Sequence, residues 1–188
     1  DVLEYDIELT SLPDRQWIDG RAKVRLKARP GGTGQLTIKL ADTLNVRSLT
    51  SDKFGRLFFL RVSNQNTLLI NLPSYLNEDE EITLTVSYAG RLEPQSPDRE
   101  TLDLGQDEPG GGQPPPMSFP DDMSIPRAEP SFLYSNRSFW YPQSTISDYA
   151  TARIRISVPI AYGCVASGDP AGPPHVQMDR ENPDNSRH

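Results

Sequence analysis

The sequence predicts an all-β domain, built as an antiparallel sandwich or an open curved pair of sheets, with a long Pro/Gly-rich insert. Apolar and polar side chains alternate with a period of two in seven segments, which indicates strands with one buried face. Clusters of turn-forming residues separate these segments. No segment combines a helical period with helix caps. Many short strands without intervening helices are typical of antiparallel sheets, whose second face can meet water.

The expected strands share a row of apolar side chains at every second position, which is taken as the buried face. In order along the chain, they are expected at residues 3–9, 21–27, 36–40, 58–62, 68–72, 82–88 and 153–158. Their apolar rows are Leu3, Tyr5, Ile7 and Leu9; Ala22, Val24 and Leu26; Leu36, Ile38 and Leu40; Phe58, Leu60 and Val62; Leu68, Ile70 and Leu72; Ile82, Leu84, Val86 and Tyr88; and Ile154, Ile156 and Val158.

Turn-forming residues predict where the chain reverses between these strands. Glycine supplies positive φ angles, and Asn and Asp bond to their own backbone, so both types favour loops. The expected loops are Asp19-Gly20, Pro30-Gly31-Gly32, residues 52–55, residues 64–66 and Ala89-Gly90.

A length of 188 residues suits one β domain, expected at residues 1–168. Residues 93–131 are expected to form a mobile inserted loop, because Pro109-Gly110-Gly111-Gly112 and a run of three prolines leave few apolar side chains to bury. The alternative for this stretch is a Pro-rich ligand for another domain, since polyproline is already extended. Residues 169–188 are expected to be a polar tail, truncated before a further domain.

The charge and the composition exclude several classes of partner. A formal net charge of -7 opposes binding to nucleic acid, because that affinity comes largely from neutralising phosphates with Lys and Arg. No stretch approaches the roughly 20 apolar residues that a transmembrane helix needs, so no membrane segment is expected. The single cysteine, Cys164, permits no intrachain disulfide. It lies in the apolar run 162–166 and is expected to be a small core residue.

The search for chemistry yields no catalytic, cofactor-binding or metal-binding residue. A zinc peptidase site needs two histidines on one helix face and a third ligand, whereas this chain has only His175 and His188, in the polar tail. The sequence contains no His-Glu-x-x-His, no Gly-x-Ser-x-Gly and no phosphate-binding glycine loop. The acidic run 78–81 lacks the spaced oxygens of a calcium loop and is expected to be a solvated turn. The chain alone is therefore not expected to be an enzyme.

The aromatic cluster Phe139-Trp140-Tyr141 follows the insert and allows two interpretations. One is a platform on which a ligand stacks, and the other is packing in the core or at an interface. Packing is favoured, because aromatic side chains dominate the energetics of both environments.

Several segments resemble, in order and spacing, the N-terminal domain of M1 zinc aminopeptidases. Residues 5–9 and then 18–24 are similar to the first strand of that domain and the "G-x-x-x-I/V" strand that follows it. Residues 68–73, Leu76 and residues 82–90 resemble its "L-x-I-x-L-P … L … L-x-I-x-Y-x-G" passage. Trp140-Tyr141-Pro142 is similar to the aromatic-Pro pair, and residues 150–168 resemble the strand-turn-strand after it.

The resemblance implies a saddle-shaped, two-sheet β domain that packs on a catalytic domain following in the same polypeptide. That later domain would hold the zinc and act on peptides, while this chain would help to shape the substrate cleft. The sequence departs from the family pattern after Pro142, where Gln143-Ser144-Thr145 stands in place of Asp-Glu-Pro. The family's residue for the substrate amino terminus is assigned to no position, so the chain resembles a divergent member. The alternative function is a free-standing β-sandwich module that binds carbohydrate or protein.

Overall fold

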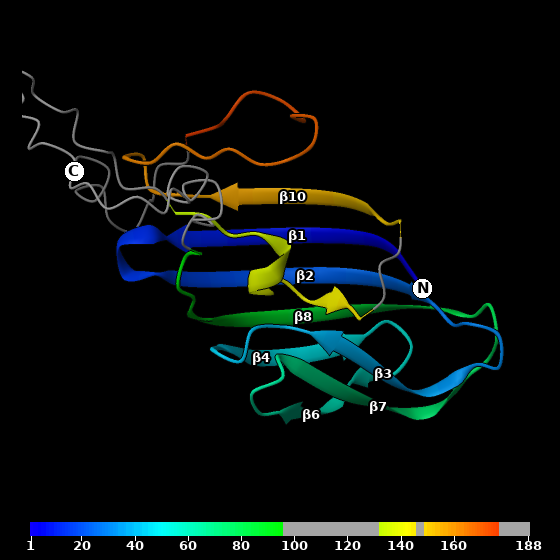
Figure 1. Ribbon diagram of the computed structural model, residues 1–188. Helices are drawn as coiled ribbons and strands as arrows, with labels where there is room; N and C mark the ends of the chain where they lie inside the picture. The colour runs from blue at the N-terminus through cyan, green and yellow to red at the C-terminus, as the bar shows by residue number, and fades with distance from the viewer. Residues whose placement is uncertain (96–131, 146–148, 177–188) are drawn as a thin grey trace, which may run out of the picture.

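The computed structural model describes residues 1–95, 132–145 and 149–176, and it consists of two β-sheets (Figure 1). The first sheet has six strands in the order β10-β1-β2-β8-β4-β5, and the second has four in the order β6-β7-β3-β9. The strands are β1 (Val2–Leu12), β2 (Trp17–Lys27), β3 (Thr33–Lys39), β4 (Leu44–Ser51), β5 (Gly55–Arg56), β6 (Phe58–Val62), β7 (Thr67–Leu76), β8 (Glu81–Arg91), β9 (Gln143–Ser144) and β10 (Thr151–Ser157). The predicted all-β, two-sheet fold is confirmed, with antiparallel pairing in all but one pair of strands.

The larger sheet is built around β2, which pairs with β1 on one side and with β8 on the other. The register between β2 and β8 is unbroken from Trp17, opposite Arg91, to Lys27, opposite Glu81. Every second side chain of these strands is buried, as the alternation predicts, and these residues form most of the core. Representative members are Ile7, Ile18, Ala22, Val24, Ile82, Leu84 and Val86, each at most 1% exposed.

The smaller sheet covers only part of the larger one. In Figure 1, β3, β6 and β7 lie beside β4 and β8, whereas β1 and β10 lie away from them. The buried side chains of the smaller sheet include Ile38, Leu68 and Ile70. The connection from β3 to β4 passes from one sheet to the other, and Arg61 of β6 fastens it. Its guanidinium donates hydrogen bonds to the carbonyl oxygens of Leu40 at 3.1 Å and of Leu44 at 2.6 Å.

Strand β4 was not predicted, because its alternation is broken. The register between β4 and β8 shifts between Val46 and Ser48, which marks a β-bulge. One extra residue at the bulge reverses which positions face the core. Leu44 is therefore buried before the bulge and Leu49 after it, five positions apart instead of an even number. A search for period two reads this segment as a loop.

Two of the five predicted loops are wrong, because Gly20 lies inside β2 and Gly90 inside β8. Both glycines lie where a neighbouring group, Tyr88 or Thr43, approaches the backbone too closely for a side chain. A Cβ on Gly20 would lie 2.4 Å from Cζ of Tyr88, and one on Gly90 would lie 2.1 Å from the carbonyl oxygen of Thr43. Glycine inside a strand often marks such a contact. The real reversal between β1 and β2 is the 3-10 turn η1 (Pro13–Arg15), and residues 30–32, 52–55 and 64–66 form turns as expected.

The one parallel pair departs from the fully antiparallel sheets that the sequence predicted. β10 runs parallel to β1, with Ile154 opposite Ile7 and Ile156 opposite Leu9. A parallel partner requires a crossover connection of a dozen or more residues, and the chain between β8 and β10 is far longer than that. Alternation alone does not reveal strand direction, so the pattern in β10 fitted either orientation.

The predicted insert, residues 93–131, lies outside the described residues except for its first three. Next to the gap, Gln95 and Leu133 form an isolated antiparallel bridge, and the amide of Gln95 donates to the carbonyl oxygen of Leu133 at 2.8 Å. The Tyr134 hydroxyl donates to the carbonyl oxygen of Leu92 at 3.2 Å. The described residues on the two sides of this gap therefore lie together, at Gln95 and Leu133.

Candidate functional site

The described residues contain no group of three or more His, Cys, Asp or Glu side chains placed to hold a metal ion. His175 is exposed in the segment after β10, and His188 lies outside the described residues. In the same described part of the chain, no helix has the length and hydropathy to cross a membrane.

Cys164 is exposed, so the prediction that it is a core residue is wrong. Its neighbour Val165 is fully exposed at 100%, and the described residues 158–176 form no strand. The apolar run 162–166 was expected to place Cys164 in the core, but among the described residues no strand pairs with this run. The segment is held instead at Tyr162, which donates a hydrogen bond to Asp14 and contacts Phe132 edge to face.

The acidic run 78–81 forms the turn between β7 and the start of β8, as the sequence predicted, and Asp79, Glu80 and Glu81 each pair with a basic side chain. Asp79 lies 2.8 Å from the Lys27 ammonium, and Glu80 contacts Lys53. Glu80 also accepts a hydrogen bond from the Asn77 amide at 2.8 Å. The hydrogen bond from Lys53 is the main cause that lowers the pKa of Glu80. The paired carboxylates therefore stabilise the turn.

The aromatic cluster packs inward, which confirms the favoured interpretation. Trp140 is only 9% exposed, and its ring lies 4.5 Å from that of Tyr141. Tyr141 in turn contacts Tyr5 of β1 edge to face at 5.4 Å. The Tyr5 hydroxyl accepts a hydrogen bond from the Ser144 amide at 3.1 Å. These contacts fasten residues 134–144, which end in β9 of the smaller sheet, onto Tyr5 of the larger sheet, and they leave no stacking platform for a ligand at Trp140.

Tyr88 is the one buried polar side chain among the described residues whose hydroxyl has no hydrogen-bond partner there. The side chain is fully buried, with its ring across Gly20. Burial raises the pKa of the Tyr88 hydroxyl, and the nearby Tyr141 and Asp19 raise it further. The hydroxyl therefore stays protonated far above the usual range for tyrosine, and its position in the core gives it no access to a substrate.

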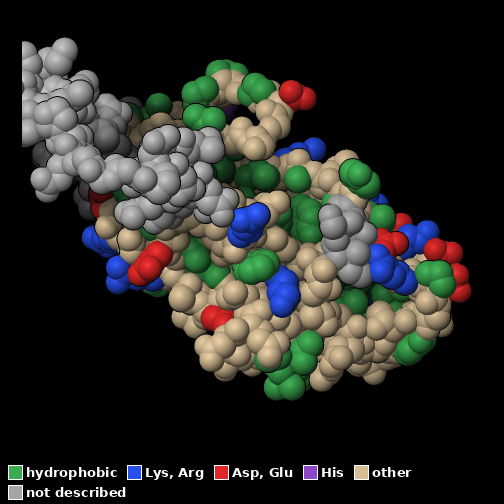
Figure 2. Space-filling view, in the orientation of Figure 1, with side chains coloured by type: hydrophobic (Ala, Val, Ile, Leu, Met, Phe, Trp, Pro, Cys, Tyr) green, Lys and Arg blue, Asp and Glu red, His purple; other side chains and the backbone are tan. Residues whose placement is uncertain are grey.

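Exposed apolar side chains lie on and around β10. Ile154 faces the same side of the sheet as its buried neighbour Ile7 but is 39% exposed, because the smaller sheet does not extend that far. Ile160 is 65% exposed and Tyr149 is fully exposed. Figure 2 shows hydrophobic side chains on the loop after β10, which arches away from the sheets. Large exposed apolar surfaces of this kind mark interaction sites.

These features define a two-sheet β domain with packed aromatics and an uncovered edge. No protein-family model matches the chain, and no curated protein matches it. Solved structures do match. They include an M1 zinc metallopeptidase from Deinococcus radiodurans, at 21% identity and a TM-score of 0.60, and a variant of a two-domain M1 zinc metallopeptidase bound to L-arginine, at 21% identity and a TM-score of 0.59.

Each of these matches covers 89% of this chain but only 34% of the matched chain. The chain thus spans about a third of the length of the metallopeptidases it resembles. At this level of identity the similarity lies in the fold, and it confirms the predicted resemblance to a β domain of M1 metallopeptidases. The activity of the full-length metallopeptidases does not follow for this chain from a shared fold.

Proposed function

We propose that this chain is the non-catalytic N-terminal domain of an M1-like zinc metallopeptidase, and that it packs on a catalytic domain that follows in the same polypeptide. The observation that carries the proposal is the match in fold over 89% of this chain to 34% of an M1 zinc metallopeptidase. A shared fold does not itself transfer an activity, so the catalytic role is assigned to the remaining part of the polypeptide.

In this proposal the β domain is residues 1–168, and residues 169–188 lead toward the catalytic domain. The zinc and the residues that act on the peptide bond belong to that later domain, which needs three protein ligands and an open position on the metal. The substrate class is peptides. One of the matched metallopeptidase structures, also at a TM-score of 0.59, is described as bound to a tripeptide substrate.

The exposed apolar side chains around β10 support the packing role. Ile160 and Val165 are 65% and 100% exposed, and Ile154 is 39% exposed although its neighbour Ile7 on the same sheet face is buried. Burying apolar surface contributes about 25 cal/mol per Å², so covering these side chains would stabilise the assembled protein. The proposed role in shaping the peptide cleft follows from this contact, because a domain packed beside a catalytic cleft forms one of its walls.

The test compares the 188-residue chain with the polypeptide extended beyond His188. The extended protein should bind one zinc ion and hydrolyse aminoacyl reporter substrates, and the 188-residue chain should do neither. Amide hydrogen exchange in residues 149–176 should be slower in the extended protein, while the amides of β6 serve as the internal control. Zinc-dependent hydrolysis by the 188-residue chain itself, or equal exchange rates in both proteins, would overturn the proposal.

A further inference from the structure

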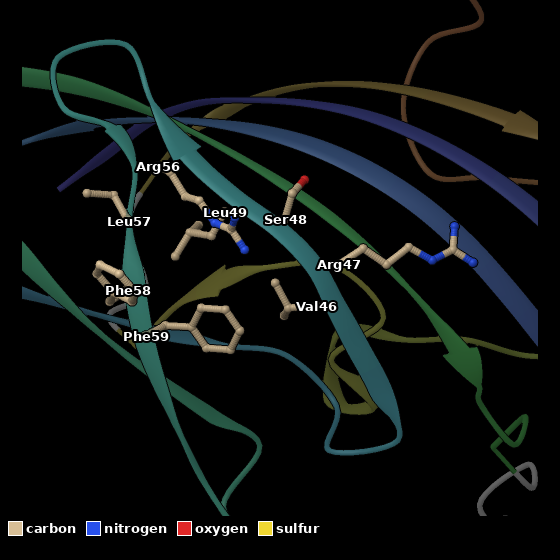
Figure 3. A pocket seen from close by; sticks show the side chains of 8 residues that line it. All are labelled: Val46, Arg47, Ser48, Leu49, Arg56, Leu57, Phe58 and Phe59. Atoms are coloured by element: carbon tan, nitrogen blue, oxygen red, sulfur yellow. The ribbon is translucent and has the colours of Figure 1, made fainter.

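Residues 55–62 form one edge of each sheet in succession. β5 is the last strand of the six-stranded sheet, and β6 is the first strand of the four-stranded sheet. Where the chain passes from one to the other, a surface pocket of about 220 Å³ opens beside β4 (Figure 3). Its apolar lining includes Val46, Leu49, Leu57 and Phe59. The volume suits one side chain rather than a whole small molecule, for which several hundred Å³ are usual.

Strand β6 lacks the devices that usually protect a free edge. Natural edge strands are blunted by charges, prolines or bulges, because their unpaired N–H and C=O groups are a template for another strand. The five residues of β6 contain no proline, and their register with β7 is unbroken. The one charged residue, Arg61, bends inward to bind the carbonyl oxygens of Leu40 and Leu44. The edge is therefore open to a further strand.

The outer face of β6 is apolar, contrary to the sequence prediction that placed Phe58 and Leu60 in the core. Phe58 is 84% exposed and Leu60 is 63% exposed, while Phe59 lies against Val46. Residues 57–60 are all apolar, so alternation could not say which face is buried. Figure 2 shows hydrophobic side chains at the margin of the molecule where β6 lies in Figure 1.

A positively charged side chain, Arg56, also lines the pocket. The Arg56 guanidinium extends over Leu49, and no described residue forms a hydrogen bond or an ion pair with it. Arg47, on the same rim, points away and pairs with Asp19 at 2.6 Å. A free guanidinium presents donors in the geometry that a carboxylate accepts with two bonds.

We propose that the β6 edge is a peptide-binding site, at which an extended segment of another protein adds as a strand, places an apolar side chain in the pocket and sets a carboxylate against Arg56. In such strand addition the backbone bonds supply affinity and pockets for alternate side chains supply specificity. The inference goes beyond the proposed metallopeptidase domain and does not depend on it. A net charge of -7 repels acidic chains at long range, so the attraction is local and acts within about 8 Å at physiological salt.

Charge complementarity favours such a peptide over a second copy of this chain. If two β6 strands paired about a two-fold axis, the residues brought opposite Arg56 would come from the partner's own edge. Residues 54–64 contain no Asp or Glu, so neither copy would supply a carboxylate along that edge. Both free guanidinium groups would remain unpaired.

The experiment selects a displayed library of random nonapeptides with free carboxyl termini on the 188-residue chain. Enriched peptides are then measured by fluorescence anisotropy, and the amides they perturb are mapped by NMR. The expected peptides alternate apolar residues and carry a carboxylate, and they shift the amides of residues 55–62. Arg56→Glu should weaken their binding about tenfold or more, because it replaces a charge-assisted pair with repulsion. Phe58→Thr should weaken it several-fold.

Arg153→Glu on the opposite edge strand is the matched control and should leave binding unchanged, since it makes the same charge change far from the pocket. Both Arg56 and Phe58 are exposed, so the variants should keep the wild-type circular dichroism and melting temperature. Three results would overturn the proposal. The first is that no peptide is enriched. The second is that the Arg56→Glu variant binds the enriched peptides as well as the wild type does. The third is that the free chain forms a dimer and that Phe58→Thr dissociates it. The last would identify the edge as a contact between copies.

Discussion

Replacing Tyr88 with phenylalanine should stabilise this domain, although most substitutions in a core destabilise it. The Tyr88 side chain is fully buried, and none of the described residues offers its hydroxyl a hydrogen-bond partner. A buried hydroxyl without a partner costs about 1–3 kcal/mol of desolvation. Phenylalanine keeps the ring against Gly20 and removes that cost, but it leaves a void the size of one oxygen atom, which offsets part of the gain. We therefore expect Tyr88→Phe to raise the free energy of unfolding by about 1 kcal/mol.

Tyr134→Phe is the matched control, because it removes the same atom from a hydroxyl that does have a partner. That hydroxyl donates to the carbonyl oxygen of Leu92 at 3.2 Å. Its loss should lower the free energy of unfolding by about 0.5–1.5 kcal/mol. The two variants should thus move stability in opposite directions.

The assay is urea unfolding followed by circular dichroism, with thermal melting as a second measurement. For a chain of this size, 1 kcal/mol corresponds to a shift in melting temperature of about 2–4 °C. An unchanged dependence on urea would show that the substitution changed stability rather than the unfolded state. If Tyr88→Phe proved less stable than the wild type, the reasoning would fail, since the hydroxyl would then have a partner that stabilises it.

Three further predictions follow from the same core. Gly20→Ala should lower the free energy of unfolding by several kcal/mol, because its Cβ would lie 2.4 Å from Cζ of Tyr88. Gly163→Ala is its control in the same urea titration. A Cβ on Gly163 would have nothing within 4 Å, so this variant should change the free energy of unfolding by less than about 0.5 kcal/mol. Arg61→Met should lower it by about 3 kcal/mol, because the carbonyl oxygens of Leu40 and Leu44 lose a charged donor; melting that matches the wild type would contradict this. Above about pH 10 the unfolded state loses the Tyr88 proton while the folded state retains it. The free energy of unfolding should therefore fall with rising pH, by up to about 1.4 kcal/mol per pH unit. In unfolding experiments at pH 9 to 11, Tyr88→Phe should show a shallower fall than the wild type.

The strands that sequence reasoning located correctly are those with one buried face and an uninterrupted register. In β2 and β8 the core side chains occupy every second position over the whole strand, so hydropathy alone gives both the strand and its buried face. The same rule fails at β4, where the bulge changes the parity, and at β6, where four consecutive apolar residues leave the face undefined. Parity is a property of the pairing between strands, which a single sequence does not display.

The glycine and cysteine errors have a different origin, because they depend on neighbours in space that are distant in the sequence. Gly20 fits a turn by its own preference, but the Tyr88 ring that requires its missing side chain is 68 residues away in the sequence. Cys164 is in an apolar run, but an apolar run is buried only if another strand pairs with it. The aromatic residues 139–141 were assigned correctly to packing, since Trp140 is buried and Phe139 and Tyr141 pack against the core.

The edge strands β10 and β6 differ in a way that separates the two proposed partners. β10 carries Arg153 and Arg155 on its exposed side, and Arg155 pairs with Glu8 at 2.9 Å, so charge guards that edge against strand addition. What β10 lacks is a cover for its inner face, as the exposure of Ile154 beside buried Ile7 shows. β6 is the reverse, because Phe59 is covered while the outer face and the edge itself are apolar and unguarded. A domain that packs over a sheet face would cover the exposed inner face at β10, and an added strand would pair with the open backbone groups of β6. Substitutions at Ile160 should therefore impair only assembly with the following domain, and substitutions at Arg56 should impair only peptide binding.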